Sequence, residues 1–240
     1  SDGGEQPEGR NVLWYKQSAR VWEEALPIGN GRLGAMVFGG VADERIQLNE
    51  SSLWDGYTLD PNNPESLETL PEVRRLLFED KNNEAVKLAE QTMMGRPRGV
   101  KPYQSLGELW FDTPHLNPDH YTRSLDLATG IASVRYQHKG TWYTRESFAS
   151  TEDDVIIVRF TADGAGKISS SFTLRRQQDA EVMPHPTDKS SLILKGRLPI
   201  KDAQGNTRGL RFAAQVKAVA VGGELQLNND VLSVAGADTL

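Results

Sequence analysis

The chain has 240 residues, of which 38% are hydrophobic, and it contains no cysteine. This length allows one large β domain or two small ones, and the lack of cysteine excludes a disulfide framework and a thiol nucleophile. The formal net charge of −6 argues against a nucleic-acid partner or an anionic membrane surface, and no apolar run reaches membrane-spanning length.

Residues 1–10, SDGGEQPEGR, are small and polar, which predicts a flexible N-terminal segment. Strands separated by tight turns are expected over residues 11–50. Within this region, residues 29–34 read GNGRLG and fit the G-x-G-x-x-G pattern of a dinucleotide-binding turn. That motif requires a buried strand before it and a helix after it.

The flanking residues favour a β-hairpin over a nucleotide site. Pro27 precedes the motif and cannot donate to a central sheet ladder. Gly39 and Gly40 stop the following apolar run before it forms a helix, and the next run, ERIQLNE, alternates apolar and polar residues. We therefore expect these glycines to serve tight turns, and we expect no cofactor.

A short helical insertion is predicted around residues 64–95. It reads as two amphipathic helices lying on the sheet, with no ligand role. Their apolar faces are expected to comprise Leu70, Val73, Leu76, Leu77, Val86, Ala89 and Met93.

After residue 95 the pattern is β to the end. Short runs with period-2 features, such as GELWFD at residues 107–112, are separated at regular spacing by turn residues, and Gly140 marks a clear hairpin. This spacing predicts a sandwich of antiparallel sheets, so the fold class is mostly β. We see no fixed-period repeat and no interdomain linker, and we expect a single domain over residues 11–240.

The residues alone display no catalytic set. The four histidines, at positions 115, 120, 138 and 185, lack a standard metal-ligand spacing, so no metal site is expected. Carboxylates are plentiful, but a sequence does not show whether two stand at the separation that a glycosidase requires. The carboxylates considered are Glu23, Glu24, Glu44, Glu50, Asp55, Glu108 and Asp112.

A long stretch resembles a known family. Residues 13–56 read LWYKQSARVWEEALPIGNGRLGAMVFGGVADERIQLNESSLWDG, and this run is similar to the amino-terminal domain of glycoside hydrolase family 95. The segments YQSLGELWFD at residues 103–112 and YTRSLDLATGIASVRYQHKGTWYTRESFAS at residues 121–150 resemble the next landmarks of that family. The resemblance covers nearly the whole chain from residue 11.

The resemblance implies a large antiparallel β super-sandwich, followed in the family by a helical linker and an (α/α)6 barrel. The barrel carries out inverting hydrolysis of α-L-fucosides, and of α-L-galactosides in some members. None of the barrel motifs occurs here, so the chain is expected to have no catalytic residue, to be inactive alone and to be truncated at its C-terminal edge. The implied partners are the catalytic barrel of the same polypeptide and, through the full enzyme, a fucosylated glycan. The implied location is secreted or periplasmic.

The loop at residues 49–57, NESSLWDGY, supplies the candidate site. Trp54 is a large aromatic residue on a polar loop, and Asn49, Glu50 and Asp55 are hydrogen-bonding groups suited to an interface or a sugar. We predict that these four residues contact the barrel or a sugar, against the alternative that Trp54 packs on its own sheet. Two other interpretations stay open: a free-standing carbohydrate-binding or lectin-like module, and a self-sufficient glycosidase using carboxylates on the sheet.

Overall fold

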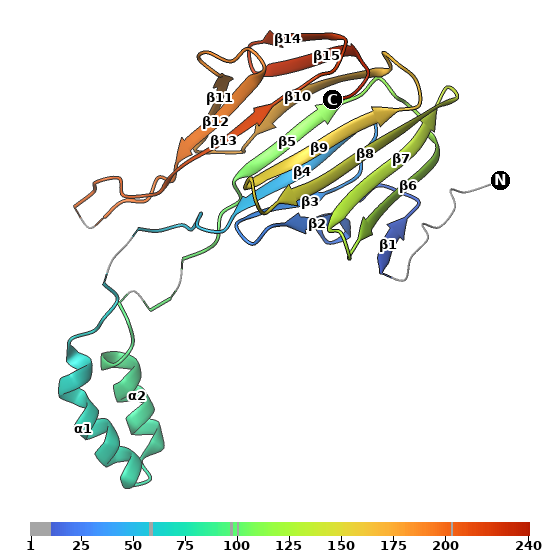
Figure 1. Ribbon diagram of the computed structural model, residues 1–240. Coiled ribbons are helices and arrows are strands. Elements are labelled where there is room, and N and C mark those ends of the chain that lie inside the picture. Colours follow the sequence, from blue (N-terminus) through green and yellow to red (C-terminus); the bar gives the residue numbers. More distant parts are fainter. Residues whose placement is uncertain (1–10, 58–59, 97, 100, 203) are drawn as a thin grey trace. The chain divides into compact units, whose positions relative to one another are not determined.

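The computed structural model describes residues 11–57, 60–96, 98–99, 101–202 and 204–240, so the expected flexible segment at residues 1–10 lies outside the described residues. The chain forms two compact units (Figure 1). The first comprises residues up to Leu53 together with Gln104–Pro199 and Leu210–Leu240, and the second comprises Trp54–Tyr103 and Ile200–Gly209. The expected limits of a single domain, residues 11–240, stay a prediction.

The first unit contains the strands. They are β1 (Val12–Tyr15), β2 (Leu26–Gly29), β3 (Leu33–Val37), β4 (Asp43–Glu50), β5 (Gly107–Asp112), β6 (Asp119–Asp126), β7 (Ile131–His138), β8 (Thr141–Ser150), β9 (Val155–Ala162), β10 (Ile168–Arg175), β11 (Ala180–Pro184), β12 (Ser191–Arg197), β13 (Arg211–Lys217), β14 (Glu224–Asn228) and β15 (Val231–Ala237). A 3-10 turn, η1, spans Trp22–Glu24.

Within the described residues these strands pair antiparallel in three sheets. Their orders are β1-β6-β7-β8-β9, β14-β15-β10-β5-β4-β3-β2 and β11-β12-β13. In the seven-stranded sheet, β2 and β3 contact β8 and β9, while β10 and β15 contact β12, so the two smaller sheets lie against it. The predicted mostly β, antiparallel sandwich is confirmed.

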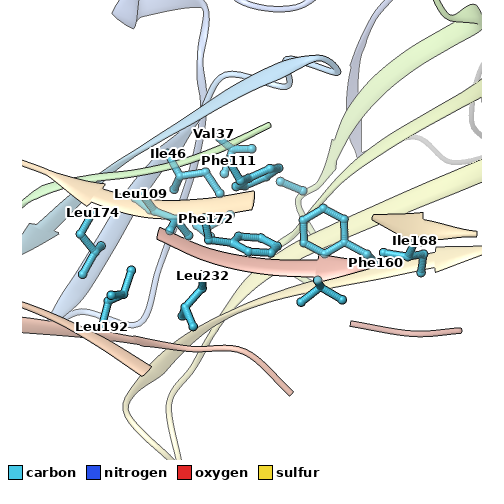
Figure 2. Packing of buried hydrophobic residues seen from close by; sticks show 14 of the residues in the cluster. Val37, Ile46, Leu109, Phe111, Phe160, Ile168, Phe172, Leu174, Leu192 and Leu232 are labelled. Carbon is cyan, nitrogen blue, oxygen red and sulfur yellow. The ribbon is translucent and has the colours of Figure 1, made fainter. Parts of the chain in front are cut away.

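The core between these sheets is aromatic and aliphatic (Figure 2). Phe111 of β5 meets Phe160 of β9 edge-on, with ring centroids 5.1 Å apart, and Phe172 of β10 lies 5.6 Å from Phe111. Leu192 of β12 and Leu232 of β15 are fully buried in the same cluster. Alternating inward residues from all three sheets therefore share one core, as two-layer β architectures require.

The glycine motif forms β-hairpins, as the sequence predicts. Gly29 pairs with Gly34 where β2 turns into β3, and β3 then pairs with β4 through the turn that contains Gly39 and Gly40. Pro27 lies on β2, which is the edge strand of its sheet, where a missing N–H is tolerated.

A buried ion pair joins the two large sheets beside this second turn. Glu44 of β4 and Arg145 of β8 are both fully buried and hydrogen-bonded to each other. Glu44 also accepts the Gly39 N–H at 2.9 Å, and Arg145 donates to the Gly40 carbonyl at 2.8 Å. Burial raises the pKa of Glu44, and Arg145 and the backbone donors oppose that rise. The turn and the pair therefore form one connected polar core.

The second unit contains the helical insertion, α1 (Glu65–Phe78) and α2 (Asn82–Thr92), which confirms its predicted position. The helices pack through Val73, Leu76 and Ala85. Two of the expected apolar-face residues are wrong, because Leu77 and Val86 are exposed. The expected placement of the helices on the sheet stays a prediction. No helix of the described residues is long and apolar enough to cross a membrane.

Candidate functional site

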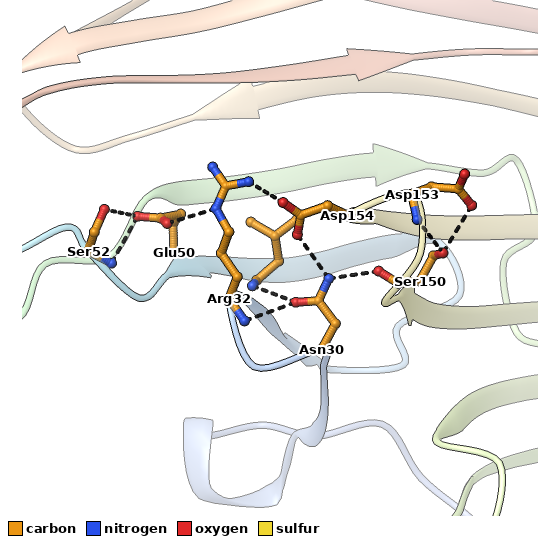
Figure 3. Close-up of polar contacts among 8 residues, drawn as sticks. Asn30, Arg32, Glu50, Ser52, Ser150, Asp153 and Asp154 are labelled. Atoms are coloured by element: carbon orange, nitrogen blue, oxygen red, sulfur yellow. Dashed lines mark hydrogen bonds and ion pairs between the residues drawn. The ribbon is translucent and has the colours of Figure 1, made fainter.

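The turn between β2 and β3 anchors a network of polar side chains (Figure 3). Asn30 Oδ1 accepts the backbone N–H groups of Arg32 at 3.1 Å and Leu33 at 2.7 Å, which closes the turn. Asn30 Nδ2 donates to the Ser150 carbonyl at 2.7 Å and to Asp154 Oδ1 at 3.1 Å. Asn30 thus ties the glycine turn to the connection between β8 and β9.

Arg32 lies between two carboxylates. Its Nε donates to Glu50 Oε1 at 3.2 Å, and its Nη1 donates to Asp154 Oδ2. The Arg32 side chain is 61% exposed, whereas that of Glu50 is 18% exposed. The hydrogen bond from Arg32 lowers the pKa of Asp154, and hydrogen bonds from Ser52 and Arg32 lower the pKa of Glu50. Both carboxyls are therefore held ionised and are poorly suited to donate a proton near neutral pH.

Two of the predicted site residues, Asn49 and Glu50, lie at the end of β4 in the first unit. Glu50 accepts the backbone N–H of Ser52 at 2.9 Å and its hydroxyl at 2.6 Å. Asn49 is half-buried and pairs with Gly34 in the β3–β4 ladder. The fold therefore brings Glu50 to the glycine turn and keeps Asn49 on the neighbouring ladder.

The other two predicted residues, Trp54 and Asp55, belong to the second unit. Trp54 is 44% exposed and forms an isolated β-bridge with Tyr103, whose ring meets the indole edge-on. The Asp55 N–H donates to the Pro102 carbonyl at 2.8 Å. The four candidates thus divide between the two units, and their contact with a barrel or a sugar stays a prediction.

Three residues of the network were missed by the sequence analysis as site residues: Asn30, Arg32 and Asp154. The Asn30-Gly31 pair is a turn signal, and it could have identified Asn30. No local signal connects Arg32 with Asp154, which is 122 residues away along the chain. Only the packing of two sheets brings these charges together.

The histidines do not form a metal centre in this arrangement. His115 is buried, with Nδ1 2.8 Å from the Tyr136 hydroxyl and its ring stacked on His138 at 4.8 Å. Burial is the main cause that lowers the pKa of His115 to about 4, so the ring is neutral at physiological pH. Across the part of the chain that the structure describes, no group of three or more His, Cys, Asp or Glu residues could hold a metal ion.

Comparison with known proteins assigns the chain to a family. A family model described as "Glycosyl hydrolase family 65, N-terminal domain" matches residues 13–240. The chain therefore belongs to this family of glycosyl hydrolase N-terminal domains. The description of this family model names glycosyl hydrolase family 65, whereas the motifs of the chain resemble those of glycoside hydrolase family 95.

The similar proteins are named as fucosidases. "Alpha-L-fucosidase 2" of Arabidopsis thaliana is 35% identical over 252 residues, which cover 94% of this chain and 29% of that protein. "Probable alpha-fucosidase A" of Aspergillus niger is 33% identical over 150 residues, covering 59% of this chain and 18% of that protein. The Aspergillus oryzae protein of the same name is 31% identical over 163 residues, covering 63% and 22%.

These matches confirm the resemblance to the amino-terminal domain of an α-L-fucosidase-type hydrolase. The chain spans less than a third of the length of each of these three relatives. Most of each relative therefore lies outside the region that aligns with this chain.

Proposed function

We propose that the chain is the non-catalytic N-terminal β-sandwich domain of an inverting α-L-fucosidase-type hydrolase. Its role is to support a catalytic (α/α)6 barrel in the same polypeptide and to form part of the carbohydrate cleft. The alignment with the Arabidopsis fucosidase carries this proposal, because it covers nearly all of this chain and under a third of that protein. The longer polypeptide is proposed to be secreted or periplasmic and to act on a fucosylated glycan.

Three of the carboxylates considered in the sequence, Glu44, Glu50 and Glu108, are paired with arginines, which supports a non-catalytic role. An inverting glycosidase needs a protonated acid and a separate base about 6.5–9.5 Å apart. Glu50 has a lowered pKa, and Glu44 is buried against Arg145. Glu108 is paired with Arg45 at 2.6 Å. Each of these carboxylates is matched to an arginine, which suits positioning more than proton transfer.

The proposed interface or sugar-contact residues are Asn49, Glu50, Trp54 and Asp55. Glu50 lies beside the exposed guanidinium of Arg32, so this end of β4 presents fixed charges. Trp54 presents a half-exposed indole. Mixed aromatic and polar groups of this kind occur both at protein interfaces and at sugar sites.

The proposal is tested by assaying two proteins, the 240-residue chain and the longer polypeptide in which it occurs. Each is incubated with 2′-fucosyllactose and with an aryl α-L-fucoside, and released fucose is measured. We expect the longer polypeptide to release fucose with inversion at the anomeric carbon, which NMR detects. We expect the chain alone to release no fucose. Fucose release by the chain, in a preparation free of contaminating glycosidase, contradicts the non-catalytic role.

A free-standing carbohydrate-binding module is not favoured. The relatives that match are hydrolases by name, and the aligned region is a minor part of each. The same experiment separates the two interpretations, because a free-standing module has no longer polypeptide with fucosidase activity.

A further inference from the structure

Trp54 and Tyr103 form an exposed aromatic pair within the second unit. Their backbones meet in an antiparallel bridge, and the next peptide is fixed by the hydrogen bond from the Asp55 N–H to the Pro102 carbonyl at 2.8 Å. The ring centroids are 5.3 Å apart with an interplanar angle of 69°. Directly opposite residues on paired strands project to the same side, so both rings face the same way.

The backbone bridge aligns the two rings, and both remain partly exposed. Trp54 is 44% exposed and Tyr103 is 40% exposed, and neither belongs to the apolar cluster that α1 and α2 form around Val73 and Leu76. Exposed aromatic surface of this size is unfavourable in water unless something covers it. A bridged pair is also preorganised, because little side-chain and loop entropy is lost when a ligand covers it.

Polar groups flank the chain segments that carry the pair. The carboxylate of Asp55 follows Trp54 directly and is half-buried. The guanidinium of Arg208 lies 6.0 Å from the centre of the Tyr57 ring, and the Lys101 side chain packs beside Gly56. This unit therefore has an aromatic surface with a carboxylate, a guanidinium and an amine on nearby residues, and these groups can accept or donate hydrogen bonds.

A pyranose ring matches this combination better than an apolar ligand does. One face of a sugar presents C–H groups, which pack on an aromatic ring, and its edges present hydroxyl groups, which need hydrogen-bond partners. A 6-deoxyhexose such as fucose also has a methyl group in place of a hydroxymethyl group. That methyl adds apolar surface of the kind that an edge-on aromatic pair covers.

We propose that Trp54 and Tyr103 form a binding platform for a fucosyl unit, with the indole as the stacking surface. This inference rests on the proposed function for its choice of sugar. It goes beyond that function by committing the pair to direct sugar contact and by adding Tyr103, which the sequence analysis did not consider. A protein surface as the occupant is treated below as an outcome against the proposal.

The test is sugar binding by the 240-residue chain, measured by saturation-transfer NMR and by titration with 2′-fucosyllactose. Sugar at about 20 mM suffices to detect a dissociation constant in the millimolar range. The variants are Trp54→Ala and Tyr103→Ala, with Trp22→Ala as matched control, because Trp22 is 52% exposed in the first unit. Lactose, which lacks the fucosyl unit, is the matched control ligand. Circular dichroism and a melting curve establish that each variant is folded.

We expect saturation transfer to the fucosyl protons and a dissociation constant that rises about tenfold in Trp54→Ala and in Tyr103→Ala, but not in Trp22→Ala. Lactose should bind at least about tenfold more weakly. No binding of 2′-fucosyllactose, equal binding of lactose, or binding that is unchanged in both platform variants overturns the proposal. It is also overturned if Trp54→Ala lowers the melting temperature of the longer polypeptide while sugar binding is retained, since this assigns the pair to a protein interface.

Failure of this inference and failure of the proposed function are distinguishable. If the longer polypeptide hydrolyses fucosides but the chain binds no fucosyl sugar, only the platform is wrong. If the chain binds the sugar through Trp54 but the longer polypeptide releases no fucose, the proposed function is wrong and the platform stands.

Discussion

Replacing Glu44 with Gln tests how much the buried ion pair between the two large sheets contributes to stability. Glu44 accepts hydrogen bonds from the backbone N–H groups of Gly39 at 2.9 Å and Arg45 at 3.0 Å, and the side-chain oxygen of glutamine can accept the same two bonds. The change therefore removes the charge more than the shape. Arg145 is 2% exposed, so its guanidinium is left in the core without a counter-charge. Removal of one partner from a buried pair costs about 3–5 kcal/mol.

The assay is urea denaturation of the chain with linear extrapolation to water. A loss of this size is a large part of the about 5–15 kcal/mol that stabilises a typical domain. The matched control is Glu108→Gln, because Glu108 pairs with Arg45 at 2.6 Å and joins the same strand β4 to β5. That pair is partly exposed, and the expected loss is about 0–1 kcal/mol.

The double variant Glu44→Gln, Arg145→Met completes the test. Because methionine removes the orphaned charge, the double variant should be more stable than Glu44→Gln alone, and the coupling between the sites should exceed about 1 kcal/mol. Additive losses, or a loss in Glu44→Gln no larger than in Glu108→Gln, would refute the reasoning that the two charges depend on each other.

Three further outcomes are expected. The pKa of His115 is lowered to about 4 in the fold, whereas the ordinary pKa of histidine is about 6.5, so the unfolded chain binds more protons between these two pH values. The free energy of unfolding should therefore fall by at most about 3 kcal/mol as the pH drops from 6.5 to 4. His115→Gln should remove this pH dependence, which is measured by denaturation at a series of pH values. Gly39→Ala should lower the free energy of unfolding by about 2 kcal/mol or more, because φ is +81° and the added Cβ would lie 2.7 Å from a side-chain carbon of Arg123. Gly31→Ala should cost less, because the space around Gly31 is open although its φ is +93°. Equal melting temperatures for the two variants would contradict this expectation. Trp54→Ala should destabilise the isolated chain by less than about 1 kcal/mol, and equal losses of about 3–5 kcal/mol in the chain and in the longer polypeptide would instead make Trp54 a core residue.

The elements that the sequence predicted are those whose local pattern agrees with their place in the fold. The run GELWFD is β5, with Leu109 and Phe111 inward and Trp110 half-exposed. The hairpin marked by Gly140 joins β7 to β8. Both Lys139 and Gly140 have positive φ, as a two-residue type I′ turn requires. Short-range chemistry was sufficient in these places.

The pattern is not sufficient where a charge occupies an inward position. Arg123 lies buried in the middle of strand β6, where an apolar residue would have completed the alternation. Its Nε donates to the Gln17 carbonyl at 2.7 Å and its Nη1 to the Glu24 carbonyl at 2.8 Å. These acceptors are about a hundred residues away along the chain, so nothing in the sequence around Arg123 indicates that the charge can be buried.

The candidate site was only partly predictable for a similar reason. Glu50 was selected as a polar residue on a loop, and it lies at the end of β4 against Arg32. Trp54 was selected for its size, but its ring partner Tyr103 is the last residue of the segment Trp54–Tyr103, so the two are distant in the sequence. A sequence shows which residues are unusual, whereas their partners depend on strand pairing over long separations.

The remaining interpretation, a glycosidase with its own pair of carboxylates on the sheet, meets a geometric objection. The strongest case for it is Asp112, whose pKa is raised by burial and by the neighbouring Asp43. These residues are directly opposite each other in the antiparallel ladder of β4 and β5. Burial and the repulsion between these two carboxylates are sufficient to raise the pKa of Asp112 without a catalytic role. Directly opposite residues have Cβ atoms about 4.5–5.5 Å apart, which is less than the roughly 6.5–9.5 Å between the carboxyls of an inverting pair, so the raised pKa of Asp112 does not identify such a pair.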